Sequence, residues 1–144
     1  MGIIHLDERG QMTVEFMITL PILLIIAVIA VNALLFFSEC AAFDRIAKEA
    51  VRIYATSPAY EQTTEQSLAR IELLLNESFE KEYLSCEVSV NGGAVGYKTY
   101  TATLRFLPTL FGLGLRSEIL GVSLPTLNHS TSLTVDPYKP GVII

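Results

Sequence analysis

Arg9-Gly10-Gln11-Met12-Thr13-Val14-Glu15, followed without a break by an apolar segment from Phe16 to Ser38, is the stretch that decides the fold of this chain. The apolar segment contains no charged residue, and its polar positions are Thr19, Asn32 and Ser38. As a helix rising about 1.5 Å per residue, it would reach roughly 35 Å, enough to cross a hydrocarbon core of about 30 Å. The sequence therefore predicts one membrane-spanning helix over about residues 16–38, with the Glu15 carboxylate at its N-terminal end.

The rest of the 144-residue chain is long enough for one small domain. The net charge is −5, and the Lys and Arg residues are scattered along the sequence. This composition lacks the basic surface of a nucleic-acid-binding protein, so we expect no nucleic-acid partner. It also lacks a polybasic patch for binding anionic lipid.

The N-terminus does not have the pattern of a cleavable secretory signal. Asp7 and Glu8 outweigh the single Arg9 in the first ten residues, and the apolar run exceeds the 7–15 residues of a signal core. The helix is therefore expected to remain as an anchor. The basic residues that follow the span outnumber Arg9, and they are Arg45, Lys48 and Arg52. That count alone would place the C-terminal domain in the cytoplasm.

The spacing of the opening residues carries a family resemblance. Arg9-Gly10 is followed by Gln11, by Glu15 at the fifth position after the glycine and by Phe16 at the sixth. This pattern resembles the leader of type IV prepilins. Pro21 lies at the eleventh position after the glycine, in an otherwise Leu- and Ile-rich run. This proline narrows the resemblance to the TadE-like pseudopilins. These are minor subunits of the tight-adherence (Flp) pilus machinery, and residues 41–52 are similar to their Ala-rich helix extension.

The resemblance implies a division of the chain into three parts. Residues 1–10 would be a leader that a prepilin peptidase removes by cutting between Gly10 and Gln11. Residues 11–57 would form a long helix whose lower half spans the membrane, and residues 58–144 an extracytoplasmic headpiece. The implied partners are the prepilin peptidase, other pilin or pseudopilin subunits, the pilus assembly platform and membrane lipid.

Glu15 needs a partner, because a charge at the edge of a membrane span is costly. Cutting after Gly10 would create a positive α-amino group on Gln11. Residues 11 and 15 share one helix face, so this amine and the Glu15 carboxylate can neutralise each other within one subunit or between neighbours. The alternative is that Glu15 only extends to the membrane interface. Pro21 removes one backbone hydrogen bond and predicts a kink in the same helix.

Two helices and a small antiparallel sheet are expected beyond the span. Ser57-Pro58 should end the first helix. Thr63 and Gln66 have the spacing of a capping box, which opens a second helix to about Leu84. The apolar stripe of this second helix comprises Leu68, Ile71, Leu75 and Phe79.

Alternating residues predict the strands. Cys86–Val90, the Asn91-Gly92-Gly93 turn and Tyr97–Phe106 indicate a β-hairpin. Ile119–Leu124 and Asn128–Val135 are further strand candidates, which gives an α+β, pilin-like headpiece. The apolar, Gly-broken stretch 108–115 predicts either a contact surface or a cover for the open end of the sheet.

Cys40 and Cys86 have two possible states. If the two helices are antiparallel, Cys86 returns to about the height of Cys40, and a disulfide would link the helices just outside the membrane. In a reducing compartment both would instead be buried free thiols.

No arrangement of residues indicates catalysis. His5 lies in the expected leader, which leaves His129 in a strand, and the sequence has no phosphate-binding loop or metal-ligand cluster. We expect no enzyme activity, metal or cofactor. The predicted function is a pseudopilin that takes part in pilus or secretion-apparatus assembly. A further possibility in the same class is an archaeal pilin with the same start. The alternative is an uncleaved, membrane-anchored accessory or scaffolding protein.

Overall fold

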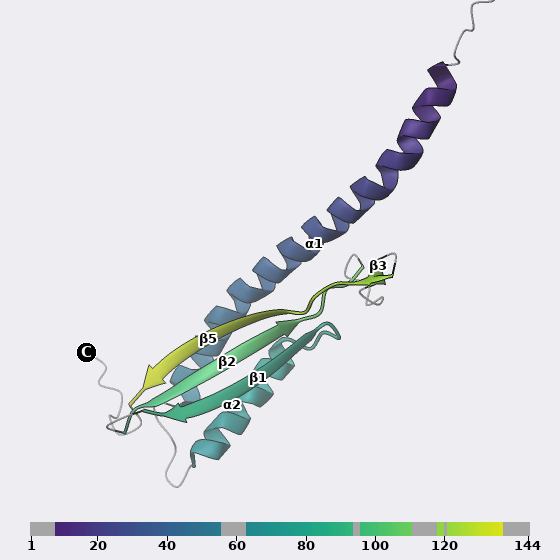
Figure 1. Cartoon of the computed structure of the whole chain (residues 1–144). Coiled ribbons are helices and arrows are strands. Elements are labelled where there is room, and N and C mark those ends of the chain that lie inside the picture. The colour runs from purple at the N-terminus through teal and green to yellow at the C-terminus, as the bar shows by residue number, and fades with distance from the viewer. Residues whose placement is uncertain (1–7, 56–62, 94–95, 111–117, 120, 137–144) are drawn as a thin grey trace, which may run out of the picture.

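The computed structural model describes residues 8–55, 63–93, 96–110, 118–119 and 121–136, and it confirms the α+β fold class (Figure 1). Two helices are present in this part of the chain, α1 (Glu8–Ala55) and α2 (Thr64–Ser78). The main sheet is antiparallel, has the order β1-β2-β5, and comprises β1 (Leu84–Gly92), β2 (Lys98–Phe106) and β5 (Leu127–Val135). A separate two-stranded ribbon is formed by β3 (Glu118–Ile119) and β4 (Val122–Ser123).

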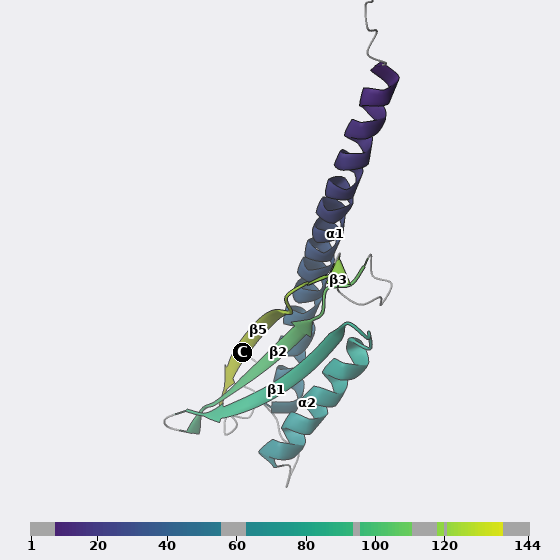
Figure 2. The same ribbon diagram turned by 45° about the vertical axis from the view of Figure 1, so that its right-hand side comes forward.

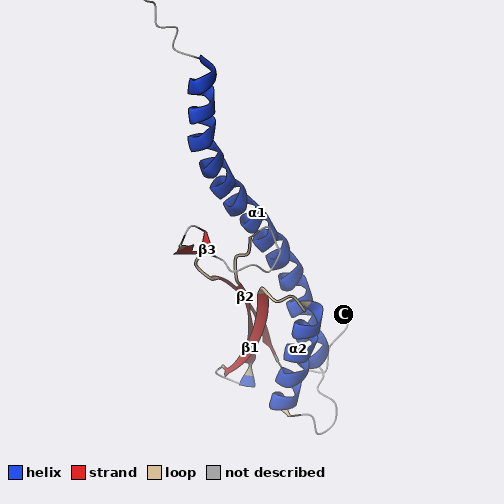
Figure 3. Ribbon diagram, turned by 90° about the vertical axis from the view of Figure 1, so that its right-hand side faces the viewer, coloured by secondary structure: helices blue, strands red, loops and turns tan. Residues whose placement is uncertain are grey.

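Helix α1 is the longest element, with 48 residues and a length of about 72 Å. It remains helical through Pro21, although a proline removes one backbone hydrogen bond. Figure 3 shows that the axis of α1 is curved along the part that projects from the headpiece. The last residue of the helix is Ala55, three positions before Pro58 and close to the expected end.

Helix α2 begins as the sequence predicts and ends earlier than expected. The Thr63 hydroxyl accepts from the Gln66 N–H, and the Gln66 side chain accepts from the Thr63 N–H, so the capping box is complete. The helix stops at Ser78, whereas the sequence predicted helix to about Leu84. Residues 80–83 form a turn, and Leu84 already pairs with Phe106 as the first residue of β1.

The predicted hairpin is confirmed, but its turn begins later than predicted, because Asn91 and Gly92 still pair with Thr99 and Lys98 at the end of β1. β1 and β2 pair from Leu84 opposite Phe106 to Gly92 opposite Lys98, and β5 continues the sheet on the other side of β2. The N–H of Gly93 donates to the carbonyl of Tyr97 at 2.7 Å and closes the turn. Because side chains alternate along a strand, one face of β2 is buried (Tyr100, Ala102, Leu104 and Phe106) and the other carries Thr99, Thr101, Thr103 and Arg105.

The C-terminal half of α1 and α2 together cover the buried face of the sheet (Figures 2 and 3). The largest fully buried side chains of this core are Phe43, Ile71, Leu75, Leu104 and Phe106. Three of the four residues expected on the apolar stripe of α2 are buried or packed at the core as predicted, and Leu68 is partly exposed. α1 therefore serves as the central support of the headpiece along about half of its length.

Phe43 offers a direct test of this core. Its ring lies 5.7 Å from the ring of Phe79 and 6.4 Å from that of His129, and none of it is exposed. We expect Phe43→Ala to lower the free energy of unfolding by about 3–5 kcal/mol, because it leaves a cavity at the junction of three elements. The measurement is urea unfolding in detergent micelles, followed by circular dichroism. The control is Leu73→Ala on the exposed face of α2, and equal midpoints for the two variants would contradict this packing.

Candidate functional site

The N-terminal half of α1 projects away from the headpiece (Figure 1). Residues 10–27, about 27 Å of helix, are exposed apart from the partly exposed Ile25. Among the described residues, α1 is the helix that is long and apolar enough to cross a membrane. In its most apolar window 11% of the residues are buried, which distinguishes it from the core helix of a globular domain.

Gly10 and Gln11 lie on this projecting part, and both are exposed. A methyl group built onto Gly10 would meet nothing within 4 Å beyond its own helix backbone and chain neighbours, so the described headpiece does not cover this position. The preceding residues 1–7 of the expected leader lie outside the described residues. The predicted cleavage position is therefore accessible within the part of the chain that is described.

Glu15 lies one turn further along the helix and is also exposed. It borders an open, shallow hollow with Met12, Thr13, Phe16 and Thr19. The Thr19 hydroxyl donates to the backbone carbonyl of Glu15 at 2.7 Å, which satisfies this hydroxyl within the helix. The ion pairs found among the described residues involve other carboxylates, so the Glu15 side chain is open to a partner from outside the described chain.

Asn32 is a polar residue of the apolar segment that the structure places in an unexpected environment. Its side chain is 5% exposed, and its amide nitrogen donates to the carbonyls of Val28 at 2.8 Å and Thr109 at 2.7 Å. Its amide oxygen accepts from the Thr109 N–H at 2.8 Å. The signal in the sequence was a single amide in an apolar run, but its partner is 77 positions away. The described part of stretch 108–115 thus contacts α1.

Glu39 and Lys81 form an ion pair just beyond the apolar segment. Glu39 is almost completely buried, while Lys81 stays half exposed and lies 5.8 Å from the centre of the Tyr83 ring. The hydrogen bond to Glu39 raises the pKa of Lys81, so the Lys81 ammonium remains charged at neutral pH. This pair ties the turn after α2 to α1.

His129 contacts the first helix rather than lying free on a strand. Its Nε2 is 2.8 Å from Oδ1 of Asp44, and both side chains are about one third exposed. The contact joins β5 to α1 at the rim of the core. It therefore links the sheet to the first helix.

Cys40 and Cys86 lie in the same buried cluster, and both are free thiols in the structure. Cys40 is on α1 and Cys86 is on β1, because α2 ends before it can carry Cys86. Burial raises the pKa of the Cys86 thiol to about 11. Burial, with Asp44 and Glu39 nearby, also raises the pKa of Cys40. Both groups are therefore poorly reactive at neutral pH.

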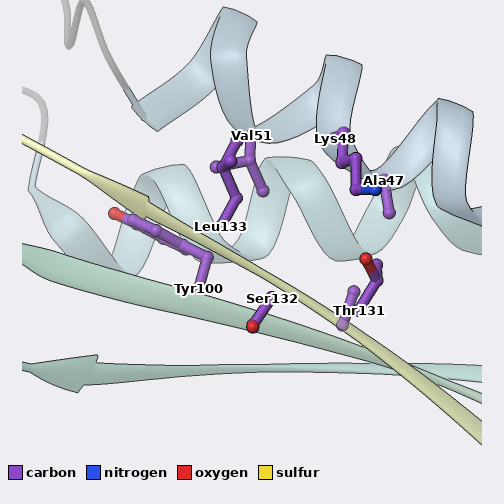
Figure 4. Close-up of a pocket in the computed structure, with 8 residues that line it drawn as sticks. Ala47, Lys48, Val51, Tyr100, Thr131, Ser132 and Leu133 are labelled. Atoms are coloured by element: carbon purple, nitrogen blue, oxygen red, sulfur yellow. The ribbon is translucent and has the colours of Figure 1, made fainter.

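One crevice of the headpiece is lined wholly by described residues, and it has no room for a ligand. The crevice in Figure 4 lies between α1 and β5, and side chains fill it so closely that no space for a water molecule remains. Its lining comprises Ala47, Lys48, Val51, Tyr100, Ala102, Thr131, Ser132 and Leu133. Among the described residues, no group of three or more His, Cys, Asp or Glu side chains could hold a metal ion.

The fold and site define a class of protein: an α+β headpiece carried on one long helix whose exposed half is a candidate membrane span. Comparisons of the chain with protein-family models, curated proteins and solved structures gave no match.

Cys86 allows a test by pH. Alkylation by iodoacetamide requires the thiolate, so labelling of the folded protein should rise with pH towards about 11, whereas the denatured protein should follow the ordinary thiol value of 9.0. Because the folded-state pKa is the higher one, the stability contribution of Cys86 is complete below pH 9 and is lost as the pH rises towards 11. Mass spectrometry of a Cys40→Ser variant counts the label.

The wild-type chain supplies the corresponding control. Denatured without reductant, it should take up two labels, one for each free thiol. Labelling that appears only after reduction would show a Cys40–Cys86 disulfide, and rapid labelling of folded Cys40→Ser protein at pH 7 would contradict the burial of Cys86.

Proposed function

We propose that this chain is a TadE-like pseudopilin, a minor subunit that is cleaved after Gly10 and takes part in assembling a tight-adherence-type pilus or a related secretion apparatus. The observation that carries the proposal is the Arg9-Gly10 pair followed by Glu15 at the fifth position, at the start of an exposed apolar helix. A plain membrane anchor has no need of this spacing. The headpiece at the other end of α1 is supported independently of the membrane, through its own core.

The exposure of the cleavage position supports processing. A peptidase must bring its catalytic groups to the peptide bond between Gly10 and Gln11, and Gly10 presents no side chain and has no covering atoms among the described residues. The headpiece packs against α1 only from Val28 onwards, so it does not hinder an enzyme at the N-terminal end.

The position of Glu15 supports a role in assembly. After cleavage, the new α-amino group of Gln11 lies about 6 Å from Glu15 along the helix axis. In the low dielectric at a membrane edge, two opposite charges attract far more strongly than in water. A neighbouring subunit could supply the amine as well as the same chain, because Glu15 is exposed and its ion-pairing position is open.

The exposed apolar half of α1 supports both a membrane state and an assembled state. Large apolar side chains cover this part on all sides, including Phe16, Ile18, Leu23 and Ile26, each more than half exposed. Lipid would cover them in the membrane, and helices of neighbouring subunits would cover them in a fibre. The headpieces, at the C-terminal end of each α1, would then lie along the outside of the fibre.

The cleavage step has a direct measurement. When the chain is expressed with a prepilin peptidase, we expect the mature protein to begin at Gln11, because Gly10 is an exposed residue without a side chain in the first turn of α1. Intact-mass spectrometry gives the N-terminus. A Gly10→Val variant should keep its leader, since the added side chain occupies the position that the enzyme must reach. An unprocessed wild-type chain starting at Met1 would favour the uncleaved accessory protein instead.

Glu15 is tested separately from cleavage. A Glu15→Val variant should be processed to Gln11 but should not enter the fibre, because the α-amino charge loses its partner. The measurements are intact mass and the amount of the subunit in sheared pili. The matched control is Glu77→Val, an exposed acid in the last turn of α2, where a carboxylate is not favoured by the helix dipole. Normal incorporation of Glu15→Val would remove Glu15 from the mechanism.

A further inference from the structure

The contact between the headpiece and α1 begins inside the apolar segment, not at its end. Val28 and Asn32 are buried, and both precede Ser38, the last residue of the expected span. The headpiece residues on this side are Pro108 and Thr109, which are buried, and Leu107, which is 47% exposed. The segment 107–110 therefore lies beside a part of α1 that the sequence assigns to the membrane.

Depth along the helix can be judged from the first charged residue after the span. Asn32 lies about 10 Å from Glu39 along the axis of α1, on the side of the projecting half. At the same level the other sides of α1 remain apolar and open, with Ile29 at 53%, Leu34 at 70% and Phe37 at 67% exposure. These side chains are suited to contact with lipid, and they lie at the height along α1 where segment 107–110 contacts the helix.

The backbone of segment 107–109 has its N–H groups satisfied, as hydrocarbon requires. The N–H of Leu107 donates to the carbonyl of Tyr83 at 2.9 Å, and Pro108 has no N–H. The N–H and the carbonyl of Thr109 are both bonded to the Asn32 side chain. A buried N–H needs a partner in any fold, and each unpaired N–H costs several kcal/mol in a bilayer core, so this closure makes the segment compatible with hydrocarbon.

Polar groups begin just beyond this level. Glu39 is paired with Lys81, whose half-exposed ammonium lies against the ring of Tyr83. Lys and Tyr are the residues that commonly occupy the interface between hydrocarbon and water, because each combines an apolar body with a polar tip. Along α1 the surroundings thus change from apolar side chains around the hydrogen-bonded amide of Asn32 to charged groups at Glu39.

We propose that segment 107–110 enters the leaflet of the membrane that adjoins the headpiece, where acyl chains contact Leu107 together with Leu34 and Phe37 of α1. Asn32 holds the segment at this depth. The headpiece is then seated partly in the membrane rather than joined to it by α1 alone. The inference rests on the membrane anchorage contained in the proposed function, and it adds a second lipid contact that this function does not require.

Tryptophan fluorescence tests the proposal, because the chain contains no Trp of its own. Three single variants of the full chain are reconstituted at low density in phosphatidylcholine vesicles, with or without bromine on the acyl chains. Leu107→Trp reports on the segment, Ile22→Trp on the projecting half of α1, and Leu73→Trp on the exposed face of α2. We expect bromine to remove most of the fluorescence of Leu107→Trp and Ile22→Trp and to leave Leu73→Trp unchanged.

The outcomes separate this inference from the proposed function. Quenching of Ile22→Trp without quenching of Leu107→Trp would overturn the inference and leave the anchor intact. Loss of quenching at Ile22→Trp would contradict the anchor itself. If bromine quenches Leu107→Trp less as the protein-to-lipid ratio rises, a second copy of the chain, not lipid, covers the segment. This result would also overturn the inference.

Two further variants test the depth and the role of Asn32. Phe37→Trp, at an exposed position on α1, should be quenched, since an unquenched Trp there would place the membrane boundary below the segment and overturn the proposal. In Asn32→Leu/Leu107→Trp, the Thr109 backbone groups lose their partner, so quenching of the Trp should decrease strongly. Unchanged quenching in this double variant would contradict the role of Asn32, and circular dichroism checks that the headpiece remains folded.

Discussion

The structure depends on close packing between the C-terminal half of α1 and one face of the sheet. Ala47 and Ala50 are each 1% exposed, and such small side chains allow strands to approach a helix closely. Phe43 fills the space beside them and contacts Phe79 and His129. With this contact in place, the 15-residue α2 and the three-stranded sheet need no other support, because α1 supplies the missing part of their core.

The same helix meets two different environments. From Phe16 to Ala27 its surface is largely apolar and exposed, which is the pattern of a candidate membrane span. Towards the headpiece it becomes amphipathic, with buried Ala and Phe on one side and exposed Arg45, Lys48 and Glu49 on the other. The change occurs near Asn32, where a polar side chain is first bonded to the headpiece.

Much of the fold could be predicted from local patterns. The alternation in β1, β2 and β5 predicted their strands and, for β1 and β2, the hairpin, and the Thr63–Gln66 spacing predicted the start of α2, because each depends on neighbours in the sequence. The end of α2 could not be predicted in this way. An apolar spacing through Phe79 and Leu84 fits a helix as well as a turn and a strand, and the pairing of Leu84 with Phe106, far along the chain, decides between them.

In the candidate site too, local sequence patterns indicated some residues and missed the contacts between distant ones. Gly10, Gln11 and Glu15 were singled out because their spacing resembles that of a prepilin leader, and the structure adds that all three are exposed. The contacts that fix the headpiece on α1 were missed, because each joins residues that are distant in the sequence. Asn32 bonds across 77 positions, Glu39 across 42 and Asp44 across 85. Composition shows that such polar groups need partners, but it does not show which partners they have.

Asn32 and Glu15 both need a polar or charged partner, but the described structure treats them differently. Both are polar side chains on a helix surface that is otherwise apolar, and both need a partner in a low dielectric. Asn32 has its partner in the folded chain, since Thr109 takes both ends of its amide. Glu15 is paired with no cation among the described residues. The described fold thus supplies a partner for Asn32 and no cation for Glu15. This is the arrangement expected if the partner of Glu15 arises later, when a new N-terminus is made or a neighbouring subunit arrives.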